Sequence, residues 1–157
     1  MRLEEIITEK SIDLELEAKS KSEAIEKLVD VLLENERIVE KEPFLQNVLE
    51  REKTESTDMG IGVAIPHGIS DAVAQPSVVI GRLKDPFYWE EDEELQEEPI
   101  FAVFLLASSK NIQGNDHLEM ISKIATLLID DDFKHTLRTA SSKTILLNAI
   151  QSHLGEM

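Results

Sequence analysis

A chain of 157 residues is long enough to bury one hydrophobic core, so we expect a single domain over residues 1–157. The absence of cysteine excludes disulfides, thiolate catalysis and cysteine-based metal sites. With 16 basic and 32 acidic residues, the formal net charge of −16 should repel nucleic acid and anionic lipid. The same field favours encounter with a partner whose docking face is basic.

The N-terminus and the hydropathy pattern indicate a cytoplasmic protein. The opening Met1-Arg2-Leu3-Glu4-Glu5 is not typical of a signal peptide. No apolar run approaches the length of about 18 residues that a membrane-spanning helix needs. We therefore expect no direct membrane insertion.

The first predicted elements are a strand and two helices. Residues 11–16 alternate polar and apolar side chains, which predicts a half-buried strand. Residues 20–23 form a capping box, and the apolar stripe of the helix that follows reaches Leu33. Pro43 suits the first turn of a second helix, which we expect to end near residues 51–53.

The middle of the chain predicts two buried strands separated by an acidic loop. Residues 77–83 are β-branched and apolar, and Asp85-Pro86 should end this strand. Residues 90–98 carry seven carboxylates in nine positions without the glycine or spacing of a calcium loop, so we expect a solvated loop. The continuous apolar run 100–107 is typical of a central strand covered on both faces.

Three helices are predicted in the last third of the chain. Asn115 can cap a helix whose core stripe runs over 118–128 and whose first turn contains His117. Further helices are expected over 131–139 and from residue 141 or 142 through Leu154. Helices flanking several strands predict a three-layer α/β/α sandwich with a central mixed sheet.

Residues 56–68, Ser-Thr-Asp-Met-Gly-Ile-Gly-Val-Ala-Ile-Pro-His-Gly, carry the most distinctive pattern. Pro66 fixes its own φ and has no N–H, so a short strand should stop where His67 begins. Gly68 lets the chain turn away or lets another backbone or a ligand come close. The imidazole of His67 would then lie at a strand end and face a pocket.

His67 alone permits two interpretations. A single histidine after a strand is more often an ordinary surface or half-buried residue than a reactive one. A histidine that accepts a phosphoryl group must be neutral, with one ring nitrogen free and the other fixed by a hydrogen bond. His117 at a helix start and Arg51 at a helix end could donate to phosphoryl oxygens. Without further information, His117 could equally be a simple helix-start residue, and Arg51 by itself is more simply a surface arginine.

Three motifs in order resemble those of a known family. The central one comprises Thr57, Gly60, Gly62 and Ala64-Ile65-Pro66-His67-Gly68, preceded by Arg51-Glu52 and followed by His117-Leu118. This pattern is similar to the phosphorylation-site signature of enzyme IIA of the fructose/mannitol type (EIIA type 2). Those proteins are cytoplasmic phosphocarriers of the bacterial sugar phosphotransferase system, and the resemblance covers roughly residues 3–152.

The resemblance implies the mannitol/fructose-type IIA fold and phosphotransferase activity without a cofactor. It makes His67 the phosphohistidine, His117 and Arg51 its catalytic partners, and Thr57 and Gly68 phosphoryl-binding residues. The phosphoryl group would come from the phosphocarrier HPr and pass to a separate IIB component for sugar uptake, with fructose the most common sugar for this motif. The alternative is a regulatory, nitrogen-type IIA-like protein in which phosphorylation of His67 controls partner binding.

Some residues depart from this pattern or suggest other sites. Asp58 stands where the family usually has glycine, which brings a carboxylate near the phosphoryl site unless it turns outward. A metal site of His67 and His117 with Asp116 or Asp71 lacks supporting spacing, and Gly60-Ile61-Gly62 is not followed by the helix that a dinucleotide loop opens. His135 and His153 match no functional motif.

Overall fold

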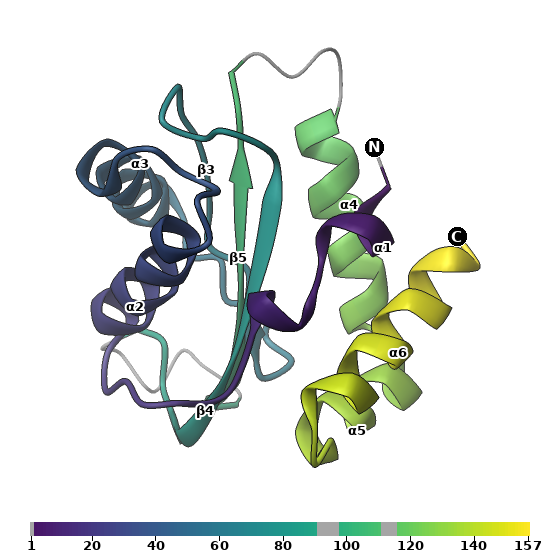
Figure 1. Ribbon diagram of the computed structural model, residues 1–157. Coiled ribbons are helices and arrows are strands. Elements are labelled where there is room, and N and C mark those ends of the chain that lie inside the picture. The colour runs from purple at the N-terminus through teal and green to yellow at the C-terminus, as the bar shows by residue number, and fades with distance from the viewer. Residues whose placement is uncertain (1, 91–97, 111–115) are drawn as a thin grey trace.

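The computed structural model describes residues 2–90, 98–110 and 116–157 (Figure 1). Of the predicted acidic loop only Glu90 and Glu98 are described, and the predicted cap Asn115 lies outside the described residues. The elements are α1 (Leu3–Ile6), η1 (Glu9–Ser11), β1 (Ile12–Leu16), α2 (Lys21–Glu34), α3 (Lys41–Thr54), β2 (Val63–Ala64), β3 (His67–Ile69), β4 (Ser77–Phe87), β5 (Ile100–Ser108), α4 (Asp116–Leu128), α5 (Asp131–Thr139) and α6 (Lys143–Gly155).

The sheet is mixed, as the sequence predicts. Its strand order is β1-β4-β5-β2, and β3 also pairs with β5. Strand β1 runs parallel to β4, β4 runs antiparallel to β5, and both β2 and β3 run parallel to β5. All nine residues of β5 are buried, which confirms the predicted central strand.

Helices cover both faces of this sheet, so the predicted three layers are confirmed. Figure 1 shows α2 and α3 on one face, with α1, α4, α5 and α6 on the other. Alternate residues of β5 enter different cores: Phe104 and Leu106 pack on the α4 side, whereas Val103 and Leu105 pack on the α2 side. The strand thus separates two apolar clusters, one on each face of the sheet.

Several predicted boundaries agree closely with the structure. Strand β1 spans the alternating residues, and Ser20 accepts a hydrogen bond from the Glu23 amide at the start of α2. Ser142 caps α6 in the same way. The short elements α1 and η1 were not predicted, because four and three residues are too few to show a periodic pattern.

The predicted end of the 77–83 strand is wrong, because β4 continues through Asp85 and Pro86 to Phe87. The ladder between β4 and β5 is irregular between Arg82 and Phe87. Pro86 lies within this interruption, where its missing N–H does not remove a regular ladder bond.

The predicted strand end at His67 also needs correction. Strand β2 stops at Ala64, but a second short strand, β3, begins at His67 and pairs with the same neighbour, β5. Pro66 separates the two, and its carbonyl oxygen still accepts a hydrogen bond from the Leu106 amide at 3.0 Å. His67 therefore lies at the start of a strand, directly after the proline.

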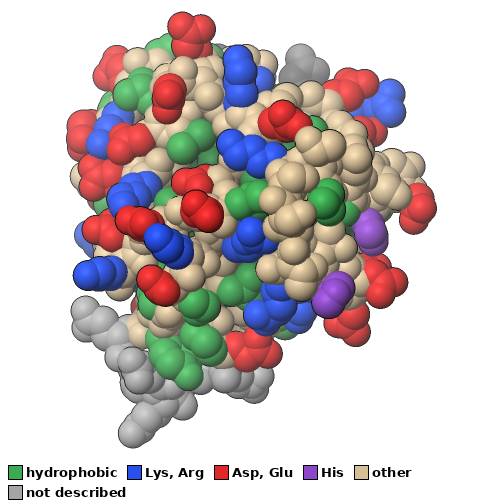
Figure 2. All heavy atoms as spheres, turned by 60° about the horizontal axis from the view of Figure 1, so that its bottom comes forward, with side chains coloured by type: hydrophobic (Ala, Val, Ile, Leu, Met, Phe, Trp, Pro, Cys, Tyr) green, Lys and Arg blue, Asp and Glu red, His purple; other side chains and the backbone are tan. Residues whose placement is uncertain are grey.

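The structure also bears on membrane contact and surface charge. Within the described ranges, every helix is too short or too polar to cross a bilayer. Figure 2 shows the end of the molecule that is lowest in Figure 1, where basic side chains lie among the acidic ones. The acidic excess is therefore not gathered into one patch on this face.

Candidate active site

The structure brings four of the predicted site residues, Arg51, His67, Gly68 and His117, together in one open pocket of about 420 Å³. The pocket lies where α3, β3 and α4 meet. Its lining includes Asn47, Arg51 and Thr54 from α3, His67 and Gly68 from β3, and His117 from α4. The interpretation of His67, His117 and Arg51 as neighbours is therefore consistent with their positions.

The local backbone fixes the tautomer of His67. Its Nδ1 lies 2.9 Å from the carbonyl oxygen of Ile65. A carbonyl oxygen can only accept, so Nδ1 carries the proton and Nε2 keeps its lone pair. Burial lowers the pKa of His67 and the charge of Arg51 lowers it further, while the Ile65 hydrogen bond and Glu52 act in the opposite direction. The lowered pKa favours the neutral imidazole, in which Nε2 carries the lone pair.

His117 lies beside His67 in the first turn of α4. The two ring centroids are 5.5 Å apart and the ring planes are inclined by 56°. Burial lowers the pKa of His117, and the neighbouring His67 adds to this effect. The Nδ1 of His117 lies 2.6 Å from Oγ of Ser108, a fully buried residue at the end of β5. Sequence reasoning missed Ser108, although it is the polar residue that ends the apolar run of the central strand.

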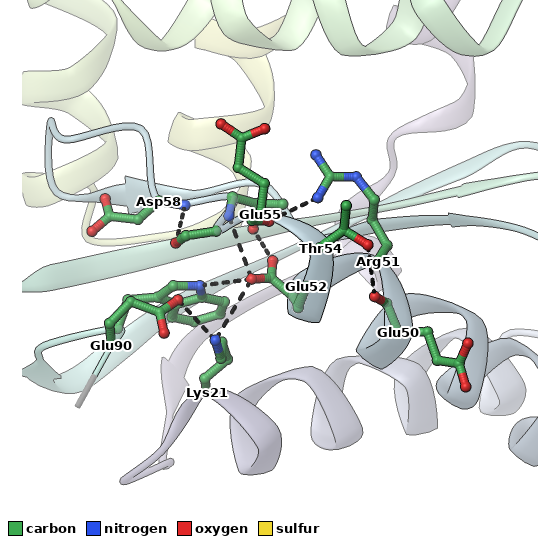
Figure 3. Close-up of polar contacts among 11 residues, drawn as sticks. Lys21, Glu50, Arg51, Glu52, Thr54, Glu55, Asp58 and Glu90 are labelled. Carbon is green, nitrogen blue, oxygen red and sulfur yellow. Dashed lines mark hydrogen bonds and ion pairs between the residues drawn. The ribbon is translucent and has the colours of Figure 1, made fainter. Parts of the chain in front are cut away.

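Arg51 lies in the last turn of α3. Its Nη1 donates to the carbonyl oxygen of Glu55 at 2.7 Å, where the chain leaves the helix (Figure 3). This bond anchors the guanidinium at the rim of the pocket and leaves other N–H groups of the fork for an anion.

Gly68 lines the pocket because α3 packs directly against β3. A Cβ atom at this position would lie 2.6 Å from Oδ1 of Asn47 and 2.9 Å from Cγ2 of Val48. The Asn47 oxygen also accepts a hydrogen bond from the Ile69 amide at 2.9 Å. The close approach expected at Gly68 is therefore that of helix α3, and Asn47 is a second residue that sequence reasoning missed.

Thr57 is not brought to the pocket. Its side chain is buried, and both its hydroxyl and its amide donate to the carboxylate of Glu52. This contact uses the hydroxyl proton that a phosphoryl oxygen would need. Thr57 therefore helps to hold the loop before β2 against α3.

The carboxylate of Asp58 is hydrogen-bonded within its own loop. Oδ1 of Asp58 accepts a hydrogen bond from the Gly60 amide at 2.8 Å, and Gly60 has a φ of 78°. Such a left-handed conformation favours glycine. The Asp58 carboxylate does not line the pocket, so it does not oppose an anion there directly.

The other chemical alternatives find no support in the described ranges. Within residues 2–90, 98–110 and 116–157, no three His, Cys, Asp or Glu side chains are grouped to hold a metal ion. Strand β2, rather than a helix, follows Gly62, so a dinucleotide loop is not formed. Nδ1 of His153 is hydrogen-bonded to the Ala149 carbonyl oxygen within α6, and the ring packs edge-to-face against Phe133. Neither His135 nor His153 is in the pocket.

Comparison with known proteins adds the family context. Residues 5–153 match the family described as phosphoenolpyruvate-dependent sugar phosphotransferase system, EIIA 2. The fructose-specific EIIABC component of Bacillus subtilis is 31% identical over 153 residues, which are 98% of this chain and 24% of that protein. The fructose-specific EIIA component of Haloferax volcanii is 30% identical over 146 residues, which are 93% of this chain and 90% of that protein.

The fold is shared with a solved structure as well. The nitrogen regulatory protein IIA-Ntr from Neisseria meningitidis superposes with a TM-score of 0.82 at 28% identity, covering 94% of this chain and 97% of the other. The present chain spans about a quarter of the Bacillus relative but nearly the whole of the Haloferax one. On this agreement of sequence and fold, the chain belongs to the EIIA type 2 family of the phosphoenolpyruvate-dependent sugar phosphotransferase system.

Proposed function

We propose that this protein is a phosphocarrier that holds a phosphoryl group on Nε2 of His67. The observation that carries this proposal is the hydrogen bond from Nδ1 of His67 to the Ile65 carbonyl. It leaves the lone pair on Nε2, in a ring that burial keeps neutral and that lines an open pocket.

In the first transfer, the Nε2 lone pair of His67 attacks phosphorus in the phosphorylated donor. The Nε2–P bond forms while the bond between phosphorus and the donor atom breaks, and its electron pair returns to the donor. In the second transfer, a nucleophile of the acceptor attacks phosphorus, and the electron pair returns to Nε2. The phosphoryl group is conserved in both steps, and no oxidant or metal is consumed.

Arg51 and His117 supply the electrostatic support for these steps. Most of the catalysis of phosphoryl transfer is positioning and stabilisation of charge on the equatorial oxygens. The guanidinium of Arg51 lines the pocket together with His67. Donation from Ser108 to Nδ1 of His117 would put the His117 proton on Nε2, where it can bind a phosphoryl oxygen.

The partners follow from family membership and charge. The donor is HPr, and the acceptor is a IIB component, which in this family holds the phosphoryl group on cysteine. The present chain has no cysteine, so it does not contain that second carrier residue. Its net charge of −16 favours encounter with a basic docking face and makes that encounter sensitive to salt.

Intact-mass analysis tests the proposal. The purified protein is incubated with phosphoenolpyruvate, enzyme I and HPr, and we expect one acid-labile phosphate on the native chain. The His67→Ala variant should gain none, whereas the matched control His135→Ala, outside the pocket, should gain one. An unchanged mass of the native chain would refute the phosphocarrier function.

The role of His117 has its own test. A His117→Ala variant should still be modified on His67 but should pass the phosphoryl group to a cognate IIB more slowly. Normal rates of transfer in both directions would remove His117 from the catalytic set.

A regulatory role is the second candidate, favoured by the close superposition on the nitrogen regulatory protein from Neisseria meningitidis. It uses the same phosphohistidine, but the phosphorylation state would control the binding of another protein. Transfer of label from the phosphorylated protein to a IIB component supports the transport function. A stable phosphoprotein that transfers to no IIB component encoded in the same genome supports the regulatory one.

A further inference from the structure

Beneath the active-site pocket lies a buried carboxylate, Glu52, that the phosphoryl-transfer steps do not use. Glu52 is only 4% exposed, although it lies in the charged last turns of α3. It accepts hydrogen bonds from the hydroxyl and amide of Thr57 and from the indole N–H of Trp89. Lys21 Nζ lies 3.8 Å from the same carboxylate (Figure 3). A buried carboxylate with so many donors is well satisfied, because an ionised carboxylate only accepts.

The hydrogen bonds continue from Glu52 to the phosphoryl acceptor. Thr57, which Glu52 holds by its hydroxyl and amide, accepts a bond from the Ile65 amide through its own carbonyl oxygen at 3.0 Å. Ile65 in turn accepts from Nδ1 of His67 at 2.9 Å. A continuous series of contacts therefore runs from Glu52 through Thr57 and Ile65 to the imidazole.

Ile65 is the residue through which this series of hydrogen bonds reaches the imidazole of His67. Its amide is tied to Thr57, and the next residue, Pro66, has a fixed φ and no N–H of its own. The direction of the Ile65 carbonyl is therefore set by the anchor on Thr57 and by the rigid proline. That carbonyl decides which nitrogen of His67 carries the proton.

We propose that Glu52 is a positioning residue for phosphoryl transfer, which acts through Thr57 and Ile65 to keep the proton of His67 on Nδ1 and the lone pair on Nε2. The consequence for transfer rate rests on the proposed function of His67, whereas the consequence for the tautomer does not. This assigns to Thr57 a role behind the imidazole instead of direct contact with the phosphoryl group.

Two substitutions interrupt the series at different points. Glu52→Gln keeps the shape of the side chain but replaces one acceptor oxygen by an N–H donor, which must then face a donor from Thr57 or Trp89. Thr57→Val replaces the hydroxyl by a methyl group of similar size, so it removes the hydroxyl bond to Glu52 and leaves the amide bond in place. Thr57→Ser restores the hydroxyl and is the conservative rescue.

Trp89→Phe is the matched control for a purely structural role. It also removes one hydrogen bond to Glu52, but Trp89 has no place in the series from Glu52 to His67. Trp89 is buried, so its loss should lower the stability at least as much as Thr57→Val. A general loosening of this region would therefore affect both variants alike.

The measurement is the tautomer of His67 by ¹⁵N NMR of histidine-labelled, unphosphorylated protein, at a pH where the ring is neutral. The rate of phosphorylation by phosphorylated HPr is measured beside it. We expect the Nδ1–H tautomer in the native protein, in Thr57→Ser and in Trp89→Phe. In Thr57→Val and Glu52→Gln we expect a mixture of tautomers and phosphorylation slower by about 10- to 100-fold.

An unchanged tautomer and rate in Thr57→Val would overturn the inference, as would an equal tautomer change in Trp89→Phe. If Glu52→Gln does not fold, Thr57→Val decides by itself. If the native protein accepts no phosphate at all, the proposed function fails, but the tautomer comparison still decides whether Glu52 positions the imidazole.

Discussion

Replacing Gly68 by alanine tests how closely helix α3 must approach strand β3, which begins at His67. The new Cβ would lie 2.6 Å from Asn47 Oδ1, 2.9 Å from Val48 Cγ2 and 3.2 Å from Phe44 Cε1. All three atoms belong to α3, so the clash is not relieved by one flexible side chain. Ordinary contact begins at 3.4 Å, so the helix must retreat locally by up to about 0.8 Å.

The expected loss of stability follows from two terms. Overpacking of this kind costs about 1–3 kcal/mol, and loss of the bond between Asn47 and the Ile69 amide costs about 1 kcal/mol more. For a domain of this size, each kcal/mol lowers the melting temperature by about 2–4 °C, so we expect a decrease of about 5–15 °C. Calorimetry or thermal unfolding followed by circular dichroism measures it.

The same shift should slow phosphorylation, because Arg51 lies one helical turn after Asn47 on α3. A misplacement of this size can reduce the rate by about 10- to 100-fold. The control is Gly155→Ala in α6, where a Cβ meets no atom within 4 Å and φ is not positive. It should leave both stability and rate nearly unchanged. A Gly68→Ala variant with native melting temperature and native rate would refute this account of the contact between α3 and β3.

Burial lowers the pKa of His67, and Arg51 adds to the effect, so an NMR titration should give a midpoint below the ordinary value of 6.5. The unfolded chain then binds this proton at a higher pH than the folded chain does. Protonation of His67 should therefore lower the free energy of unfolding as the pH falls below 6.5. A titration midpoint at or above 6.5 would contradict this. Arg82 donates to carbonyl oxygens at the end of α5 and in β1. Arg82→Met should therefore lower the free energy of unfolding, measured by urea denaturation, by about 2–4 kcal/mol. Phosphorylation of this variant should persist. Phe104 is fully buried in β5, so Phe104→Ala should cost about 3–5 kcal/mol, whereas Ile145→Ala, at 47% exposure, should cost well under that; similar losses from these two would disprove the assigned cores.

Much of the fold can be predicted because its signals are local. The alternation in β1, the capping serines of α2 and α6, and the unbroken apolar run of β5 lie within short stretches of the chain. Each signal reflects the period of one element or the chemistry of one helix end. The predicted end of the 77–83 strand was wrong because it depends on the neighbouring strand. Strand β4 includes Pro86, at a place where its ladder with β5 is irregular.

Some features of the site could also be predicted from the sequence, and others could not. The order of motifs around His67, Arg51 and His117 predicted a phosphohistidine only through the resemblance to EIIA type 2, because the residue types alone also fit an ordinary histidine after a strand. The burial of Glu52 could not be predicted, since its neighbours in sequence, Glu50, Arg51 and Lys53, suggest a solvated helix face.

Most of the longer strands and helices, the capping serines of α2 and α6, and the resemblance to the family could be read from the sequence alone. The contacts around the pocket came only from the folded structure: Ser108 with His117, Asn47 with the Ile69 amide, and Glu52 with Thr57. The physical reason is that most of these contacts join different elements across the packed layers. Their geometry depends on how α3, β5 and α4 settle against one another, and no local period or propensity carries that information.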